Sequence, residues 1–157
     1  MIQIHIMGVE IERKFLVAGE FPRLESSKMI QGYLSSESDC TVRVRLEDNK
    51  AVLAIKGRAV GIRRAEFEYD IPIEEARELL ALCGDKVIEK TRYYCPSGNH
   101  VWEVDVFHGL NEGLVTAEIE LSNEDEVFAR PDWLGQEVSD DPRYRNSQLC
   151  VFPYSRW

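Results

Sequence analysis

Glu10-Ile11-Glu12-Arg13-Lys14 sets charged side chains two residues apart, and this spacing recurs along the chain of 157 residues. In an extended strand, residues two apart point to the same side. Each such segment therefore places two like charges on one face and mostly apolar residues on the other. The further segments are Arg43-Val44-Arg45, Glu66-Phe67-Glu68, Lys90-Thr91-Arg92, Glu103-Val104-Asp105 and Glu118-Ile119-Glu120. Together they predict a sheet that gathers charges of both signs on one surface.

Any one of these segments has a simple explanation, because the solvated face of an ordinary sheet also carries charges. Six segments sorted by sign are harder to explain in that way. Like charges side by side repel, and a cross-strand ion pair at a surface contributes only about 0.2–1 kcal/mol. A barrel closed around a charged interior explains the clusters better, since a polyanion that arrives with divalent cations would neutralise both signs.

The pattern of the whole chain predicts eight strands and few helices. Strands are indicated by apolar and polar residues that alternate between turn residues. They are expected at residues 9–17, 28–35, 40–47, 51–56, 64–71, 87–94, 101–107 and 114–121. The clearest helix is expected at residues 73–83, with Gly84 as its C-terminal cap. Shorter helices are expected from Ser122 towards Ala129 and after the loop that ends at Asn146.

These elements predict an α+β fold: an eight-stranded antiparallel closed β-barrel, or tunnel, with a polar lumen and helices packed on the outside. An eight-stranded barrel encloses room for one small ligand. A length of 157 residues without a repeat or a linker fits a single domain over residues 1–157. Within it, residues 1–8 are interpreted as an N-terminal extension and residues 150–157 as a C-terminal tail.

Composition is that of an ordinary globular protein, with 44% hydrophobic and 30% charged residues. No apolar run reaches membrane-spanning length, and residues 1–7 are too short and too polar for a signal peptide. Four scattered cysteines without a Cys-x-x-Cys pair favour reduced thiols and a cytoplasmic location. The formal net charge of −9 argues against a nucleic-acid duplex as partner, but not against a small phosphorylated substrate. A homodimer is possible.

Glu10-x-Glu12-x-Lys14 resembles the hallmark motif of the CYTH superfamily, the triphosphate tunnel metalloenzymes. Each further motif is modest in specificity, but their number and order make the resemblance strong. They are Gln31-Gly32-Tyr33-Leu34, Val42-Arg43-Val44-Arg45, Ile55-Lys56, residues 64–68, residues 89–93, residues 102–107, residues 117–121, Gly135-Gln136-Glu137-Val138 and Arg143-Tyr144-x-Asn146. The resemblance covers the chain from about Val9 to Leu149.

The resemblance implies an eight-stranded antiparallel tunnel that binds a triphosphate chain with Mg²⁺ or Mn²⁺. The chain is most similar to bacterial inorganic triphosphatases, which implies hydrolysis of tripolyphosphate to pyrophosphate and phosphate. A metal-activated water would attack a terminal phosphorus in line with the leaving group. The alternatives are a class IV-type adenylyl cyclase, a phosphohydrolase of thiamine triphosphate or nucleoside triphosphates, and a non-catalytic polyphosphate-binding module. The His-Phe pair typical of the cyclases is not found, since His5 is followed by Ile6.

Cationic side chains are expected to hold the phosphates, because arginine contacts phosphate oxygens in pairs and lysine acts as a point charge. The candidates are Arg43, Arg45, Lys56, Arg64, Lys90 and Arg92. Arg58 and Arg63 compete with Arg64 for its role. Lys14 and Tyr33 share the expected lumen face, and the resemblance implies that such a Lys/Tyr pair acts catalytically near the scissile phosphate.

Carboxylates beside a polyanion repel it unless a metal ion intervenes. Mg²⁺ and Mn²⁺ prefer oxygen ligands from one or two carboxylates, from phosphates and from water. The candidate metal ligands are Glu10, Glu12, Glu66, Glu68, Glu118 and Glu120. Glu103 and Asp105 are supporting candidates that either join the ligands or orient lysine and arginine side chains, and the sequence does not choose between the two roles.

Overall fold

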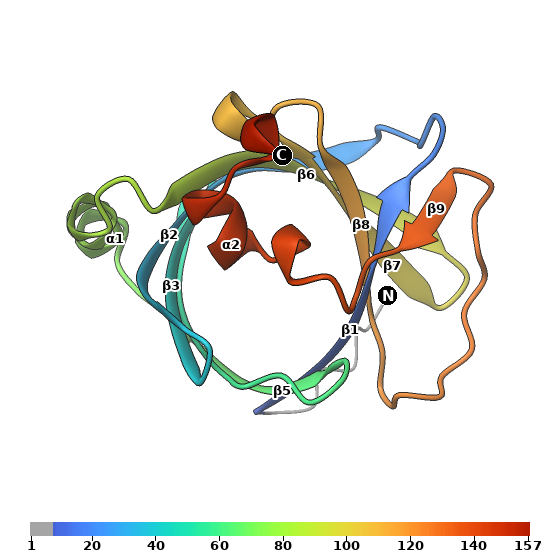
Figure 1. Cartoon of the computed structure of the whole chain (residues 1–157), viewed down its shortest axis with the longest axis horizontal. Helices are drawn as coiled ribbons and strands as arrows, with labels where there is room; N and C mark the ends of the chain where they lie inside the picture. Colours follow the sequence, from blue (N-terminus) through green and yellow to red (C-terminus); the bar gives the residue numbers. More distant parts are fainter. Residues whose placement is uncertain (1–7) are drawn as a thin grey trace.

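The computed structural model describes residues 8–157, and a closed ring of antiparallel strands dominates it (Figure 1). The strands are β1 (Val9–Val17), β2 (Glu25–Glu37), β3 (Cys40–Glu47), β4 (Lys50–Gly57), β5 (Arg63–Asp70), β6 (Val87–Ser97), β7 (His100–Phe107), β8 (Val115–Glu120) and β9 (Leu134–Glu137). The described helices are α1 (Ile73–Leu82), α2 (Asn146–Val151) and the 3-10 turns η1 (Gly109–Asn111), η2 (Pro142–Tyr144) and η3 (Tyr154–Arg156). His5 and the expected N-terminal extension, apart from Gly8, lie outside the described residues.

Strand pairing closes the ring. The strands follow the order β5-β4-β3-β2-β6-β7-β8-β1, and β1 then pairs with β5. Residues 12–16 of β1 pair with β8, while residues 9–11 pair with β5 along the opposite edge. Further along that edge, the short strand β9 pairs with the end of β1 outside the ring. The prediction of an eight-stranded antiparallel closed barrel is therefore confirmed, with one additional strand.

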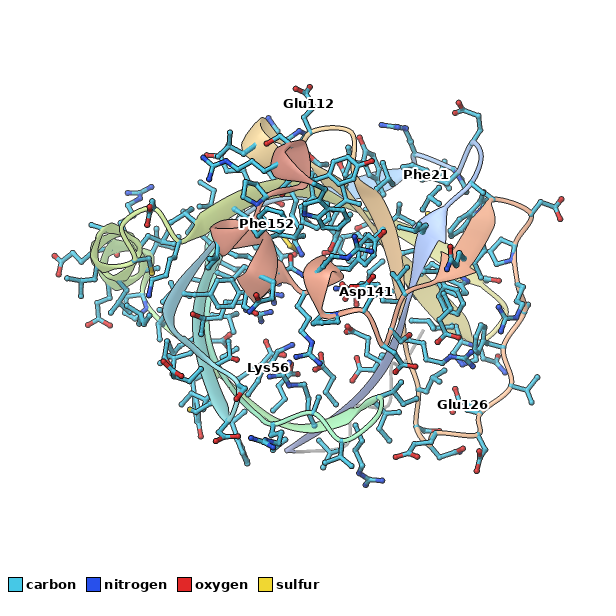
Figure 2. All side chains as sticks on the ribbon, viewed as in Figure 1. Phe21, Lys56, Glu112, Glu126, Asp141 and Phe152 are labelled. Atoms are coloured by element: carbon cyan, nitrogen blue, oxygen red, sulfur yellow. The ribbon has the colours of Figure 1, made fainter. Side chains whose placement is uncertain are left out.

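The pairing register decides which residues face the interior. Lys56 of β4 lies opposite Glu66 of β5. Arg92 of β6 lies opposite Asp105 of β7. Because side chains alternate between the two faces of a strand, such pairs fix the inward positions all round the ring. Figure 2 shows Lys56 inside the ring, whereas Glu126 points away from it.

Apolar side chains stabilise the barrel mainly from its outside. Phe15 and Trp102 are completely buried on β1 and β7, and Phe128 packs edge-on against both rings. Helix α1 covers a second cluster over β2, β3 and β4, which includes Val44 and Ala76. Full burial of a large apolar side chain contributes about 1.5–3 kcal/mol. These outer clusters leave the lumen available for charged residues.

A third apolar cluster closes one end of the lumen. It contains Ile88, Phe107 and Leu114, and Phe107 is the register partner of the inward-facing Lys90. Leu149 of α2 is buried among them. Helix α2 and the turn η2 therefore lie across one mouth of the ring, as Figure 1 shows. The expectation of helices on the outside is met by α1, whereas η2 and α2 cover the end of the lumen.

One local prediction is wrong: residues 122–129 form turns and irregular backbone instead of a short helix. Asn123 accepts a hydrogen bond from the main-chain N–H of Asp125 at 3.0 Å, which favours a turn over a helix. Val127 is 88% exposed while its neighbour Phe128 packs on the barrel, so the segment has no continuous apolar helical face.

The other predicted elements are present with shifted ends. Strand β2 differs most, because it begins at Glu25 within a segment expected to be a loop. Helix α1 ends at Leu82, and Gly84 follows with a φ of 65°, as expected of a glycine that ends a helix. No helix in residues 8–157 is long and apolar enough to cross a membrane.

Candidate active site

The lumen holds a cavity of about 480 Å³ with a predominantly charged wall. Every site residue predicted from the sequence lines this cavity except Asp105, which is completely buried. The lining set contains Glu10, Glu12, Lys14, Tyr33, Arg43, Arg45, Lys56, Arg64, Glu66, Glu68, Lys90, Arg92, Glu103, Glu118 and Glu120. All eight strands of the ring contribute, so the barrel brings together residues that are far apart in the sequence.

Arg43 and Arg45 of β3 form a basic strip along one wall. An Nη2 atom of each lies near the same Glu68 oxygen, at 3.9 Å from Arg43 and 3.7 Å from Arg45. Burial lowers the pKa of Arg45, and the positive charge of Arg43 lowers it further. The Nε atoms of both arginines are buried without a hydrogen-bond partner among residues 8–157. Arg45 Nε lies 3.6 Å from Glu47 Oε2, which is an ion-pair contact but too long for a hydrogen bond. Buried donors without a hydrogen bond are costly, so the strip suits an anionic ligand that accepts from them.

Lys56 of β4 lies between two carboxylates. Its Nζ atom is 3.0 Å from Glu10 Oε1 and 3.0 Å from Glu66 Oε2. Burial opposes the charged form, but the attraction of Glu10 and Glu66 outweighs it and raises the pKa of Lys56. Lys56 therefore stays positively charged in the cavity.

Strand alternation resolves the competition among three neighbouring arginines. Arg64 lines the cavity and donates from Nε and Nη2 to the carbonyl oxygen of Gly57, at 3.1 and 2.8 Å. Arg63 is exposed, and Arg58 pairs with the exposed Asp39 at 2.6 Å. Arg64 is therefore the one of the three that reaches the cavity wall through its side chain.

Asp105 holds two of the cavity cations from behind. Its Oδ2 accepts a hydrogen bond from Lys90 Nζ at 2.7 Å, and its Oδ1 accepts one from Arg92 Nε at 2.8 Å. Burial would raise the pKa of Asp105, but Arg92 and Lys90 lower it below its ordinary value. Burial lowers the pKa of Lys90 to about 8 despite Asp105. Arg92 also pairs with Glu103. These contacts support an orienting role for both acids.

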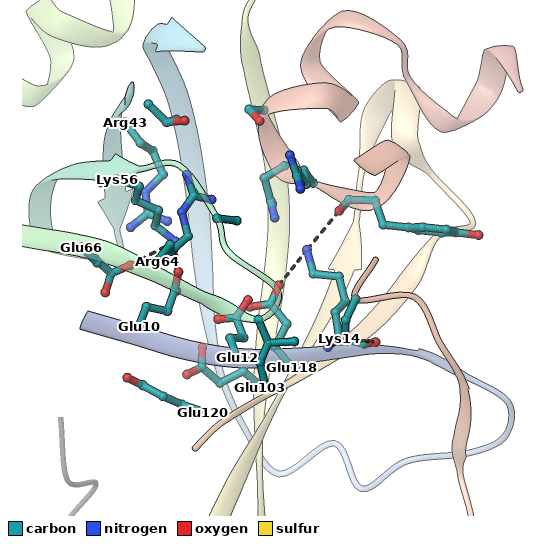
Figure 3. Close-up of a pocket in the computed structure, with 18 of the residues that line it drawn as sticks. Glu10, Glu12, Lys14, Arg43, Lys56, Arg64, Glu66, Glu103, Glu118 and Glu120 are labelled. Atoms are coloured by element: carbon teal, nitrogen blue, oxygen red, sulfur yellow. Dashed lines mark hydrogen bonds and ion pairs between the residues drawn. The ribbon is translucent and has the colours of Figure 1, made fainter. Parts of the chain in front are cut away.

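Glu12, Glu103, Glu118 and Glu120 group together in the close-up of Figure 3. Burial raises the pKa of Glu12, and the negative charges of Glu118 and Glu10 raise it further. Burial acts on Glu118 too, but Lys14 and Arg92 outweigh it and lower the pKa of Glu118. Glu12 shares a hydrogen bond with Glu118. The pKa values of the two carboxyl groups are therefore shifted in opposite directions, as expected of two acids that lie close together and have different cationic neighbours.

The chemistry of these donors fits a divalent cation. Glu12 and Glu118 offer carboxylate oxygens at a point where their own repulsion favours a positive charge. Across the part of the chain that the structure describes, no group of three or more Asp, Glu, His or Cys side chains is arranged to hold an ion alone. Ions such as Mg²⁺ commonly use one or two carboxylates and complete their shell with phosphate and water. The arrangement therefore suits a cation that binds together with a polyphosphate.

The other predicted metal ligands already face cations. Glu10 and Glu66 contact Lys56, as described above, and Glu68 faces the basic strip of β3. Arg43 and Arg45, together with a hydrogen bond shared with Glu66, lower the pKa of Glu68 against the effect of its burial. Each of these three carboxyl groups thus lies beside a lysine or an arginine, whereas Glu12 shares a hydrogen bond with another acid, Glu118.

Lys14 and Tyr33 line the same cavity with different neighbours. Lys14 Nζ lies 3.2 Å from Glu118 Oε1 and donates to the carbonyl oxygen of Tyr144 at 3.0 Å. Tyr33 lies opposite Arg43, and burial raises the pKa of its hydroxyl to about 12. The hydroxyl is therefore protonated at neutral pH and is able to donate a hydrogen bond.

Several residues between 138 and 147 line the cavity, although no pattern in the sequence predicted a site role for them. They are Val138, Ser139, Asp141, Tyr144, Arg145, Asn146 and Ser147. Asn146 Oδ1 accepts a hydrogen bond from Lys90 Nζ at 3.1 Å. The motif Arg143-Tyr144-x-Asn146 marked this segment as similar to the family, but no spacing rule connects Asn146 with a lysine on a distant strand.

A closed barrel with this interior defines a tunnel protein that receives a small polyanion. The CYTH domain model matches residues 8–147. The chain therefore belongs to the CYTH family, and the resemblance noted in the sequence is confirmed. The segment after residue 147 lies beyond the match.

Two relatives carry the name inorganic triphosphatase. The protein from Acetivibrio thermocellus is 49% identical over 154 residues, which cover 96% of this chain and 99% of the relative. The protein from Nitrosomonas europaea is 36% identical over 149 residues, which cover 90% of this chain and 97% of the relative. The crystal structure of the inorganic triphosphatase NE1496 is similar with a TM-score of 0.65 at 34% identity, covering 90% of this chain and 94% of the other.

Proposed function

We propose that the protein is an inorganic triphosphatase that hydrolyses tripolyphosphate to pyrophosphate and phosphate with the help of a divalent cation. The observation that carries the proposal is that six predicted phosphate-binding cations and a set of glutamates line one cavity of about 480 Å³. The name that the relatives at 49% and 36% identity share supports the inorganic substrate. Tripolyphosphate offers the matching chemistry, a short chain of anionic oxygens.

The cations hold the substrate. Arg43 and Arg45 lie along one wall, their Nε donors form no hydrogen bond within residues 8–157, and arginine binds phosphate oxygens in pairs. Lys56 and Lys90 add point charges. Arg92 and Arg64 also bind phosphate oxygens, and Arg64 is held in place by its hydrogen bonds to the Gly57 carbonyl oxygen. Asp105 supports this grip, because it fixes the side chains of Lys90 and Arg92 before the substrate binds.

The carboxylates hold Mg²⁺ or Mn²⁺. The proposed ligands are Glu10, Glu12, Glu66, Glu68, Glu118 and Glu120. When bound, such an ion neutralises phosphate oxygens and lowers the pKa of a water molecule in its shell. A cation bound there would favour the ionised form of Glu12, whose pKa is raised by burial and by the negative charges of Glu118 and Glu10.

Lys14 and Tyr33 act on the phosphate that is cleaved. Lys14 brings an ammonium group to the carboxylate-rich side of the cavity, where it stabilises the negative charge that develops on phosphate oxygens. Tyr33 donates a hydrogen bond from a hydroxyl that remains protonated at neutral pH. Neither residue needs to form a covalent bond with the substrate, because water is the nucleophile.

The test is phosphate release from tripolyphosphate, ATP and thiamine triphosphate, each supplied with Mg²⁺ or Mn²⁺. We expect tripolyphosphate to be preferred and to give one phosphate and one pyrophosphate per molecule. Glu118→Gln/Glu120→Gln keeps the side-chain shape but removes two negative charges. It should lower kcat/KM by at least about 100-fold, since each charge-assisted contact is worth about 1.5–3 kcal/mol.

The matched control is Glu112→Gln/Glu124→Gln, which removes two exposed carboxylates outside the cavity and should retain wild-type activity. Formation of cyclic AMP from ATP would show that the protein is a cyclase and not a hydrolase. Binding of tripolyphosphate without phosphate release would point to a binding module. Full activity of the Glu118→Gln/Glu120→Gln protein would contradict the metal-site assignment, while the reaction itself would stand.

A further inference from the structure

One main-chain oxygen of the turn η2 accepts a hydrogen bond from Lys14, a side chain assigned to catalysis. Lys14 Nζ donates to the carbonyl oxygen of Tyr144 at 3.0 Å, and this is its contact besides Glu118 in the described residues. A carbonyl group has no side-chain freedom of its own, so its position depends on how the residue that carries it is packed. The contacts of the Tyr144 ring therefore bear on the position of Lys14.

Trp157 holds the Tyr144 ring from the outside. The two ring centroids lie 4.9 Å apart at an interplanar angle of 81°, an edge-to-face contact. The guanidinium of Arg143 lies 4.8 Å from the centroid of the Trp157 ring. The Trp157 indole N–H donates to the carbonyl oxygen of Phe152 at 3.1 Å. With 37% of its surface exposed, Trp157 contributes little to the core, but its ring packs against that of Tyr144.

The segment that carries Trp157 is itself fixed to the barrel. Asn111 is buried, and its Oδ1 accepts a hydrogen bond from the main-chain N–H of Tyr154 at 2.8 Å. Its Nδ2 donates to the carbonyl oxygen of Leu149 at 3.4 Å. The Tyr154 ring meets that of Trp157 with centroids 5.1 Å apart. The segment that carries Trp157 is thus held in place by hydrogen bonds to Asn111. Trp157 lies beyond residue 147, where the family match ends.

We propose that Trp157 is a positioning residue for Lys14, acting through the ring and the carbonyl oxygen of Tyr144. Without the indole, the turn that carries Tyr144 loses its outer support, and Lys14 keeps Glu118 as its partner but loses a fixed second one. Within residues 8–157, the ring contacts and hydrogen bond of Trp157 involve Tyr144, Tyr154, Arg143 and Phe152, and not the arginines proposed to grip the phosphates, so we expect substrate binding to be preserved. A small displacement of a catalytic group lowers the rate far more than it lowers binding.

Trp157→Ala tests this proposal. We expect kcat for tripolyphosphate to fall about ten-fold and KM to change less than two-fold. Trp157→Phe, which keeps an aromatic edge against Tyr144, should restore most of kcat. Phe152→Ala is the control, because it removes a half-exposed ring from the same segment. Within residues 8–157, the aromatic ring that packs against Tyr144 is that of Trp157 and not that of Phe152. The melting temperatures of the two alanine variants should agree within about 2–4 °C.

A second measurement does not depend on turnover. The ¹H–¹⁵N correlation of lysine ammonium groups reports their hydrogen bonds, and Lys14→Gln identifies the Lys14 signal. That signal should shift or broaden in Trp157→Ala and stay in place in Phe152→Ala. The inference relies on the proposed function only for the role of Lys14 in turnover. A wild-type protein without triphosphatase activity would overturn the proposed function. The spectrum would still show whether Trp157 fixes the position of the Lys14 ammonium group.

An unchanged Lys14 signal in Trp157→Ala would overturn the inference. So would a loss of activity that appears in KM alone, or one that Phe152→Ala reproduces. Either loss would mean that Trp157 stabilises the C-terminal segment in general and does not position Lys14. A Trp157→Phe protein as impaired as Trp157→Ala would also contradict the role assigned to the aromatic contact.

Discussion

Lys90 illustrates how partners, and not solvent, maintain the charges inside the barrel. Its ammonium is almost completely buried and donates to Asp105 and Asn146, at 2.7 and 3.1 Å. Burial lowers the pKa of Lys90 to about 8, and Asp105 prevents a larger fall. Lys90 is therefore mostly charged at neutral pH and loses its proton at a pH that an enzyme assay reaches.

This balance predicts an alkaline limit of activity. As pH rises through about 8, the free enzyme loses the positive charge of Lys90, so kcat/KM for tripolyphosphate should decline. Lys90→Arg keeps a positive charge at every assay pH. A pH profile of kcat/KM measures the effect, and the decline near pH 8 should disappear in Lys90→Arg. A wild-type profile that stays level to pH 10 would contradict the assignment of Lys90 to the substrate grip.

Loss of activity above pH 8 should not reflect unfolding. The folded pKa of Lys90 lies below the value of an unfolded lysine, so between the two the unfolded chain binds more protons. The contribution of Lys90 to the free energy of unfolding therefore becomes more favourable as pH rises through this range. Circular dichroism across the same pH series separates the titration from unfolding.

Strand periodicity explains why so much of the fold and the site could be predicted from the sequence. The side-chain repeat of two residues is a local property, so the alternation around Glu12 and Lys14 could be read without knowing any partner strand. The same rule placed Arg43 and Arg45 inward. Once the strands close into a ring, all these positions converge, and the cavity contains each predicted residue except Asp105.

Contacts between distant segments could not be read in the same way. The carbonyl oxygen that binds Lys14 belongs to Tyr144, and a main-chain atom leaves no signature in the sequence. Strand β9 has only four residues and little alternation. It pairs closely enough that a Cβ atom at Gly135 would lie 2.9 Å from the carbonyl oxygen of Leu16. Gly135 was noted for its motif, but the need for close backbone approach emerges only from the pairing.

Helix α1 depends on close contact with β2, and Gly32 is the point of contact. A Cβ atom there would lie 2.7 Å from Cys83 Sγ and 2.8 Å from Leu80 Cδ2. Gly32→Ala should therefore lower the free energy of unfolding by about 1–3 kcal/mol through overpacking. It should leave KM nearly unchanged, because Gly32 faces α1 and not the lumen. Urea unfolding and steady-state kinetics measure the two effects.

Gly19→Ala provides the control for this element. Its Cβ atom would lie 3.8 Å from Trp133 Cα, an ordinary contact, so stability should change by less than about 0.5 kcal/mol. Equal stability of the two variants would show that α1 tolerates displacement from β2. A Gly32→Ala protein with normal stability but a raised KM would instead place this position in the site.

The whole molecule reverses the usual arrangement of a globular protein. Apolar side chains cover the outside of the ring beneath α1 and the loops, while charged side chains fill its middle. The outer clusters supply the burial of apolar surface that folding requires. The lumen then holds like charges side by side, an arrangement that stability alone does not favour and that a ligand of opposite charge relieves.

The central claim is that the enclosed charges, and not the outer ones, bind the triphosphate chain. Calorimetric titration with imidotriphosphate, in which nitrogen replaces the bridging oxygens, tests it directly in the presence of Mg²⁺. Arg43→Ala removes an inward arginine, and Arg13→Ala removes an arginine that pairs outside the ring with Glu137. We expect at least about ten-fold weaker binding for Arg43→Ala, since a charge-assisted contact is worth about 1.5–3 kcal/mol, and less than a two-fold change for Arg13→Ala. Equal losses, or a larger loss in Arg13→Ala, would contradict it.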